Sequence, residues 1–192
     1  TVTCMAVSYP ATAVITATTV DGGFTASCEV TFVKQKVESV SFESSEITVY
    51  EGGTQTLSAV INPSDATIKG VTWSSSDSNI AAVENGVVTA VSTGDAVITV
   101  TTDDGGFTAD CKVMVRANKD ALNSMIEKVL NANLDKDNYP AEDWQALSEA
   151  LTAAEEVYAA ELATQTEVDD AASKLSNAFA ALGTSCLLYT SD

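Results

Sequence analysis

Two hydrophobic periodicities divide the sequence near residue 116. Before that point, β-branched and other apolar residues alternate with polar ones, most clearly over residues 54–61 and 95–101. Alternation of this kind places one set of side chains on a single face of a β-strand. Turn-forming stretches separate the runs at 51–53, 62–65, 84–86, 93–95 and 103–106. About seven short strands therefore fit between residues 37 and 115, and this spacing predicts an antiparallel β-sandwich of the Ig-like type.

One phrase of the β-rich part occurs twice. Residues 18–30 read TTVDGGFTASCEV and residues 101–113 read TTDDGGFTADCKV, with ten of thirteen positions identical and a spacing of 83 residues. Two adjacent glycines supply the positive φ that a tight turn needs, so we expect the second copy to close the last hairpin of the sandwich. The spacing suits a repeated small β domain. We therefore expect residues 1–35 to be the C-terminal part of a preceding, truncated Ig-like repeat in a tandem array.

After residue 116 the apolar residues recur at intervals of three and four. This period places each set of apolar side chains along one face of an α-helix. The first set is Leu122, Met125, Ile126, Val129 and Leu130; the second is Trp144, Leu147, Leu151, Ala154 and Tyr158; the third is Val168, Ala171, Ala172, Leu175, Phe179 and Leu182. Short intervening loops predict that residues 117–183 form an antiparallel bundle of three helices, each about 12 to 20 residues long.

The ends of the second and third helices carry their own signals. Pro140 suits the first turn of the second helix. Thr166 and Asp169 are three residues apart and resemble a capping box at the start of the third helix. Gly183 is expected to end that helix.

Four cysteines are spread along the chain without a CxxC pair. Cys28 and Cys111 occupy the same position in the two repeat copies, and we expect both to be small buried apolar groups. A disulfide between Cys4 and Cys28 is the alternative. Residues 184–192 continue neither periodicity and resemble translated sequencing-adaptor sequence, so we interpret them as a non-native tail in which Cys186 has no functional role.

Residues 36–116 resemble a bacterial Ig-like domain of group 2. The resemblance is carried by the phrases at residues 40–42, 61–67, 71–77, 80–83, 86–91 and 96–100. Residues 1–33 are similar only to the final strands of that family. The resemblance implies a sandwich in which Trp73 is a core aromatic residue on a central strand.

Residues 117–183 resemble a FIVAR domain. The matching pieces are Asn138-Tyr139-Pro140 with Trp144 and Leu147, then Ala150, Leu151 and Ala154, then Ala163-Thr164-Gln165 with Glu167-Val168-Asp169, and finally Leu175 and Leu182. This resemblance implies a module of bacterial surface proteins and secreted glycan-active enzymes, with Pro140 where the family often has Thr or Ser. Localisation outside the cell, at the bacterial surface or secreted, is therefore expected.

The charge balance excludes several function classes. The chain has 27 acidic and 9 basic residues, no His, and a net charge of −18, so its surface repels nucleic acid and anionic lipid. No apolar run approaches the ~20 residues that membrane insertion needs. Without His, a Ser-His-Asp triad, a Cys-His pair and a His-ligated metal are excluded. The sequence also lacks a P-loop and a GxGxxG motif.

Carboxylates are the remaining candidates for chemistry. Two adjacent pairs, Glu155 with Glu156 and Asp169 with Asp170, would point about 100° apart on a helix and would not converge on one bond. Four loop carboxylates could attract calcium, but Asp77, Asp95, Asp103 and Asp104 do not follow the spacing of an EF-hand loop. We therefore expect no enzyme activity, no metal and no cofactor in this chain.

Glycan binding usually requires an exposed aromatic ring with polar neighbours. Trp144 falls on the apolar face of the second helix and is expected in the core, whereas Tyr139 lies just before that helix and is expected to be exposed. Its polar neighbours are Asp137, Asn138, Glu142 and Asp143, so these five residues are the candidate glycan site.

Three functions remain open. The first is a non-catalytic spacer and adhesion-type module of a bacterial surface or secreted multidomain protein. Because Ala117 and Asn118 leave almost no linker, the bundle should then dock closely on the sandwich. The second is a carbohydrate-binding accessory module of a secreted glycan-degrading enzyme, with cell-wall or host glycan as the partner. The third is contact between the sandwich edge and a host surface protein. Other domains of the same chain are partners in every case.

Overall fold

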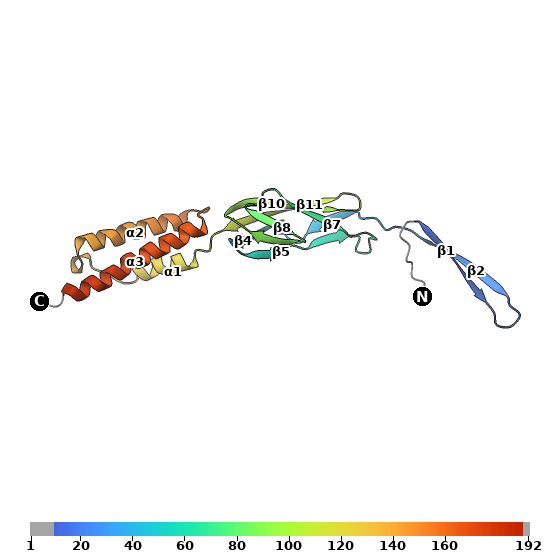
Figure 1. The fold of residues 1–192 in the computed structure, drawn as a ribbon, viewed down its shortest axis with the longest axis horizontal. Coiled ribbons are helices and arrows are strands. Elements are labelled where there is room, and N and C mark those ends of the chain that lie inside the picture. The colour runs from blue at the N-terminus through green and yellow to red at the C-terminus, as the bar shows by residue number, and fades with distance from the viewer. Residues whose placement is uncertain (1–9, 190–192) are drawn as a thin grey trace. The chain divides into compact units, whose positions relative to one another are not determined.

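The computed structural model describes residues 10–189, with side chains as far as Gly183. Within these residues a β-rich region precedes a helical region (Figure 1). Eleven strands lie between Ala11 and Arg116, and three α-helices with one short 3-10 helix follow. The chain is thus an Ig-like β region followed by an α domain, as predicted from the change in hydrophobic period.

Nine strands make up the sandwich. They are β3 (Ser39–Phe42), β4 (Glu46–Tyr50), β5 (Thr54–Thr56), β6 (Ala59–Asn62), β7 (Val71–Ser75), β8 (Ala81–Glu84), β9 (Val87–Ala90), β10 (Gly94–Thr102) and β11 (Thr108–Arg116). One sheet has the order β4-β11-β10-β7, a second has the order β5-β9-β8, and β3 pairs with β6. The prediction of about seven strands was too low, because a strand as short as β5, with three residues, is too brief to show alternation.

Strand β11 runs parallel to β4, with Lys112 opposite Glu46 and Arg116 opposite Tyr50. Strands β5 and β8 both pair antiparallel with β9. The expected antiparallel arrangement is therefore wrong for the β4–β11 pair. Alternation reveals which side chains share a face, but it carries no information about the direction of a partner that is distant in the sequence.

The strands of the sandwich bury their apolar faces in a common core. Its members are Val49, Leu57, Ala81, Val88, Ala90, Ala96, Ile98, Cys111, Val113 and Val115. Trp73 on β7 is half-buried against this core, and its ring centroid lies 5.7 Å from that of Phe42. Such aromatic pairs are worth about 0.5–1.5 kcal/mol beyond the area they bury. Trp73 packs against the core as predicted, but β7 is the edge strand of its sheet, so the predicted position on a central strand is wrong.

A separate hairpin precedes the sandwich and contains the first copy of the repeated phrase. It consists of β1 (Ala11–Thr18) and β2 (Thr25–Phe32), which form a two-stranded sheet in the described part of the chain (Figure 1). Ile15 lies opposite Cys28 in its register. The front half of an Ig-like repeat does not accompany this hairpin within the described residues.

The turns of the two repeated hairpins have the same hydrogen bonds. The amide of Thr19 donates to the carbonyl of Phe24 at 2.9 Å, and the amide of Thr102 donates to the carbonyl of Phe107 at 2.9 Å. In return the threonine hydroxyl oxygen accepts from the phenylalanine amide at 3.0 Å in both turns. The first glycine of each turn has a φ of +78° and +87°, respectively. The predicted glycine-dependent turn is thus present in both copies.

The two equivalent cysteines differ in burial. Cys111 on β11 is fully buried in the sandwich core, as expected. Cys28 on β2 is exposed, so the expectation of a second buried cysteine is wrong. The cause is that, within residues 10–189, no sheet lies opposite β1–β2 to bury the face that carries Cys28. Cys4 lies outside the described residues, so the alternative of a Cys4–Cys28 disulfide stays a prediction.

The helical domain has three α-helices that contact one another pairwise. They are α1 (Asp120–Leu130), α2 (Ala141–Ala159) and α3 (Gln165–Tyr189), with the 3-10 helix η1 (Lys136–Asn138) between the first two. Their buried core comprises Ala117, Leu122, Ile126, Val129, Leu147, Ala154, Ala163, Val168, Ala171, Leu175 and Leu182. The bundle is as predicted, but α1 has 11 residues and α3 has 25, both outside the expected range.

The capping signals of α2 and α3 lie one or two residues from their predicted positions. Pro140 is the N-cap of α2 rather than a residue of its first turn. The capping box of α3 is formed by Thr164 and Glu167. The Thr164 hydroxyl oxygen accepts from the Glu167 amide at 3.2 Å, and the Glu167 carboxylate accepts from the Thr164 amide at 2.9 Å. Thr166 and Asp169 were the wrong pair, because this motif occurs twice in adjacent register and the sequence does not say which one starts the helix.

Helix α3 continues through Gly183 to Tyr189, so the expected stop at Gly183 is wrong. Gly183 is not among the glycines with positive φ, the conformation that a C-terminal glycine cap requires. A glycine inside a helix costs only about 1 kcal/mol relative to alanine, which neighbouring helical residues can offset. Secondary structure therefore marks no boundary between residue 183 and the proposed tail, and residues 190–192 lie outside the described part.

Among the described residues, none of the helices is both long and apolar enough to cross a lipid bilayer.

Candidate functional site

The candidate glycan site lies at the start of α2. The rings of Tyr139 and Trp144 are stacked, with centroids 6.3 Å apart and planes inclined by 22°. Tyr139 is half-buried and packs against the bundle core, so the expectation that it is the exposed aromatic residue is wrong. Asp137, Asn138 and Glu142 are exposed, and Asp143 is half-buried and already takes part in an interaction.

A groove of about 240 Å³ adjoins this stacked pair. It is lined by Val129, Leu130, Asn133, Leu134, Trp144, Leu147, Ser148 and Leu151. None of the five predicted site residues lines it. Trp144, which sequence reasoning assigned to the core, is half-buried and forms part of the wall. Most of the wall is apolar, and the amide of Asn133 and the hydroxyl of Ser148 are the polar groups.

Three of the four loop carboxylates considered for calcium are engaged by protein groups. Asp104 accepts hydrogen bonds from Lys34 and from the amide of Val37. Asp95 pairs with two cations, and Asp77 accepts from the amide of Asn79 at 2.9 Å. Across the described residues, there is no cluster of three or more Cys, Asp or Glu side chains with the geometry to hold a metal ion.

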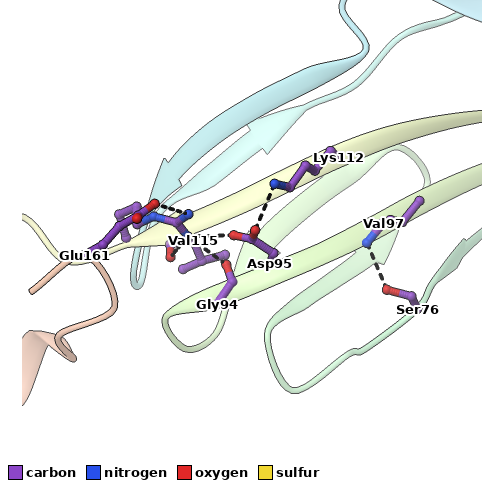
Figure 2. A network of polar contacts seen from close by, with 8 residues as sticks. Ser76, Gly94, Asp95, Val97, Lys112, Val115 and Glu161 are labelled. Carbon is purple, nitrogen blue, oxygen red and sulfur yellow. Dashed lines mark hydrogen bonds and ion pairs between the residues drawn. The ribbon is translucent and has the colours of Figure 1, made fainter.

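A cluster of polar contacts lies at the end of the sandwich and includes a residue of the bundle. Arg116, the last residue of β11, donates to the carboxylate of Asp95 at 2.8 Å and to the carbonyl of Gly94 at 3.2 Å (Figure 2). Its second terminal nitrogen donates to the carboxylate of Glu161 at 3.1 Å, on the loop between α2 and α3. Lys112 holds the other oxygen of Asp95 at 2.9 Å. One guanidinium thus bonds to groups of both domains.

These contacts shift the ionisation of the groups involved. Hydrogen bonds from Lys112 and Arg116 lower the pKa of Asp95. Partial burial by itself lowers the pKa of Arg116, but hydrogen bonds and charge attraction from Asp95 and Glu161 outweigh it and raise that pKa overall. Both shifts favour the charged forms of Asp95 and Arg116, which stabilises the ion pair between them.

Lys119 caps the end of α2. Its ammonium group donates to the carbonyl oxygens of Tyr158 at 2.9 Å and Ala160 at 2.5 Å. The same nitrogen lies 5.9 Å from the centre of the Tyr158 ring. The last carbonyls of a helix have no partners within the helix and carry partial negative charge, so a cation there is favourable.

Asn118 is held by Gln165 at the start of α3. The Gln165 side chain accepts from the Asn118 amide at 2.8 Å and donates to its carbonyl at 3.2 Å. The Gln165 amide in turn donates to the carboxylate of Glu51 at 3.4 Å, in the turn after β4. The Glu51 amide donates to the Arg116 carbonyl at 2.9 Å. With Ala117 buried in the bundle core, every residue from Arg116 to Lys119 is engaged.

The short linker was predicted from the sequence, but the hydrogen bonds and ion pair of its residues were not. The usable signal was the sequence Arg-Ala-Asn-Lys at residues 116–119, which places two cations and an amide where the period changes in a strongly acidic chain. Their partners Glu161 and Gln165 are more than 40 residues away in the sequence, and no local pattern connects them.

The fold and this junction define a class of protein, an Ig-like sandwich joined directly to a small helical module. Residues 36–113 match the family described as Bacterial Ig-like domain (group 2), and residues 118–183 match the FIVAR domain. The chain therefore carries a bacterial Ig-like domain of group 2 followed by a FIVAR domain.

Three of the further similarities are to parts of two enzymes and to a solved surface-layer structure. An α-L-arabinofuranosidase of Bifidobacterium longum subsp. longum is 45% identical over 71 residues, which are 36% of this chain and 7% of that protein. A κ-carrageenase of Pseudoalteromonas carrageenovora is 42% identical over 81 residues, 42% of this chain and 20% of that protein. Domains 4 and 5 of the S-layer protein SbsC align at 21% identity and a TM-score of 0.38, covering 55% of this chain and 58% of theirs. The chain thus spans only a small part of these curated relatives.

Proposed function

We propose that this chain is a non-catalytic spacer of a bacterial surface or secreted multidomain protein, which holds neighbouring domains at a fixed separation outside the cell. Both matched families are accessory modules. Similarity to small parts of two much longer glycan-degrading enzymes supports an accessory role over a catalytic one.

The observation that carries this proposal is the absence of a free linker over residues 116–119. Arg116 bonds to Glu161, Ala117 is buried in the bundle core, Asn118 bonds to Gln165, and Lys119 caps α2. A flexible connection between binding modules is usually polar, Gly- or Ser-rich and unbonded. A segment in which each residue is bonded limits hinge motion between the two domains. A spacer needs this restriction, whereas a tethered binding module does not.

The test is the flexibility of the full chain in solution. Small-angle scattering and ¹⁵N relaxation should show that the sandwich and the bundle tumble together. The double variant R116A/K119A should let them tumble separately. K69A/K174A removes the same charge at two exposed lysines away from the junction and should change nothing. Independent tumbling of the two domains in the unmodified chain would contradict the spacer proposal.

A second candidate function is glycan binding by the helical domain. It is favoured by the stacked Tyr139–Trp144 pair beside the groove, because a ring that is held in place by another ring can receive the face of a sugar. The candidate residues for this function are Trp144, Asn133 and Ser148 in the groove, with Tyr139 and the exposed Asp137, Asn138 and Glu142 nearby. Asp143 belongs to the same segment.

The glycan proposal is tested by retention of the full chain on insoluble polysaccharides, mucin and bacterial cell wall, with and without calcium. Retention that free sugar competes off, and that W144A abolishes, would support it. Tyr50→Ala removes an exposed aromatic residue from the sandwich and is the matched control. No retention on any of these materials would leave the spacer role alone.

A further inference from the structure

The segment after the last strand of each repeat copy carries a cation at a different position. In the first copy β2 is followed by Val33 and Lys34, and in the second copy β11 ends at Arg116 and is followed by Ala117. With the spacing of 83 residues, Val33 corresponds to Arg116 and Lys34 corresponds to Ala117. The cation is thus at the second position in the first copy and at the first position in the second copy.

Lys34 contacts the sandwich that follows it. Its ammonium group lies 2.5 Å from the carboxylate of Asp104, in the turn between β10 and β11. The other oxygen of Asp104 accepts from the amide of Val37 at 3.1 Å. Only 11% of the Asp104 side chain is exposed, and 28% of the Lys34 side chain. One carboxylate therefore holds the segment that enters the sandwich at two points three residues apart.

Arg116 contacts the helical domain that follows it. It reaches Glu161, and the alanine at the next position packs into the bundle core. A lysine at position 117 would have to bury its charge in that core, which is costly without a partner. Conversely, an alanine at position 34 would leave Asp104 without its cation. Each arrangement fits the domain that follows and does not fit the other.

We propose that the position of this cation, Lys34 or Arg116, specifies which kind of domain docks after an Ig-like repeat, since the other cation of each segment, Lys36 or Lys119, is at the same position in both copies. A cation at the second position selects another Ig-like repeat through the aspartate of its Asp-Gly-Gly turn. A cation at the first position followed by alanine selects the helical domain. In the first arrangement the cation binds the carboxylate of the turn aspartate, which also accepts a hydrogen bond from a backbone amide of the entering segment.

The test exchanges the two arrangements in the full chain and follows amide hydrogen exchange by NMR. V33R/K34A gives the first segment the second arrangement, and R116V/A117K does the reverse. The first variant should speed exchange of the Val37 amide by roughly threefold to tenfold, and the second should do the same for Asn118. Each variant should leave the other amide unchanged.

Single substitutions keep the proposal testable if a double variant fails to fold. K34A and D104N should each speed exchange at Val37 to a similar extent. K174A removes an exposed cation of the helical domain, and D21N changes the equivalent turn aspartate of the first copy, so both should leave Val37 unchanged within about twofold. Unchanged exchange at Val37 in K34A and D104N, or at Asn118 in R116V/A117K, would overturn the proposal. The docking proposal does not depend on the spacer function, because docking could be specific even if the domains proved mobile.

Discussion

The β1–β2 and β10–β11 hairpins have nearly the same sequence and very different surroundings. Both have the threonine and phenylalanine hydrogen bonds at the turn, and both have glycines with positive φ. In β10–β11 one face is buried in a core that includes Ile98 and Cys111. In β1–β2 the equivalent Ile15 and Cys28 are exposed.

This difference separates what a short sequence determines by itself from what it gains through packing. The turn geometry depends on residues within six positions of one another, so it forms in both places. Burial depends on opposing strands that come from elsewhere in the chain. A two-stranded hairpin alone is marginally stable in water, whereas the same hairpin inside a sandwich is part of a cooperative unit.

The largest effect should come from truncating the two equivalent isoleucines. Ile98→Ala removes a fully buried side chain and should lower the free energy of unfolding of the sandwich by about 2–4 kcal/mol. Ile15→Ala should lower it by less than about 0.5 kcal/mol, since Ile15 is outside that core. Urea denaturation followed by Trp73 fluorescence in a Trp144→Phe background measures both. Equal losses would mean that β1–β2 folds as part of the same unit.

Alanine substitution of the first glycine in each turn should test the same difference between the two hairpins. A Cβ on Gly105 would lie 2.5 Å from the Phe107 ring at a φ of +87°, and a Cβ on Gly22 would lie 2.6 Å from the Phe24 ring at +78°. Gly105→Ala should destabilise the sandwich by about 1–3 kcal/mol. Gly22→Ala should leave the sandwich midpoint unchanged despite the same local strain. A shift in both variants would contradict the independence of the first hairpin.

The two equivalent cysteines should react with alkylating reagents at different rates. Burial, together with the nearby charge of Glu46, raises the pKa of the Cys111 thiol and reduces its reactive thiolate form. Cys28 is exposed and should be alkylated at least about tenfold faster in the folded protein. Peptide mass spectrometry after timed labelling distinguishes the two sites. In urea their rates should converge, and persistence of the difference there would point to a cause other than burial.

The smallest effect should be the pH dependence of the Asp104 contact. The Lys34 ammonium, followed by the Val37 amide, lowers the pKa of this carboxyl from its ordinary value of 3.8. A carboxyl of this kind contributes stability above its ordinary pKa and loses it as the pH falls through its lowered value. The stability difference between the unmodified chain and D104N should therefore narrow from about pH 5 toward about pH 2. D21N should show no such trend in the sandwich, and a difference that widened on acidification would contradict the assigned sign.

The sequence was sufficient for features that depend on nearby residues. The alternating runs predicted the sandwich, the three- and four-residue spacing predicted the helices, and the paired glycines predicted both turns. It misplaced the capping box by two residues because Thr164–Glu167 and Thr166–Asp169 have the same spacing. It did not show the parallel β4–β11 pair or the exposure of Cys28, which depend on distant strands. The truncated tandem repeat stays a prediction.

The candidate sites were harder to predict for the same reason. Tyr139 was expected to be exposed because it precedes a helix, but packing against the bundle core half-buries it. Trp144 was assigned to the core from its helical phase, yet it lines the groove. Glu161 lies 45 residues from Arg116, and Asp104 lies 70 residues from Lys34, so only the folded chain brings these partners together.

The parallel pairing of β4 and β11 has a mechanical consequence. The chain enters the sandwich at β3, passes into β4 and leaves at the end of β11. Strands β4 and β11 are paired from Glu46 with Lys112 to Tyr50 with Arg116. Tension between the start of β4 and the end of β11 would pull these neighbouring strands in opposite directions along their length. All the hydrogen bonds of the pair would then bear the load together in shear rather than opening one at a time. The sandwich would therefore resist extension at this pair of strands.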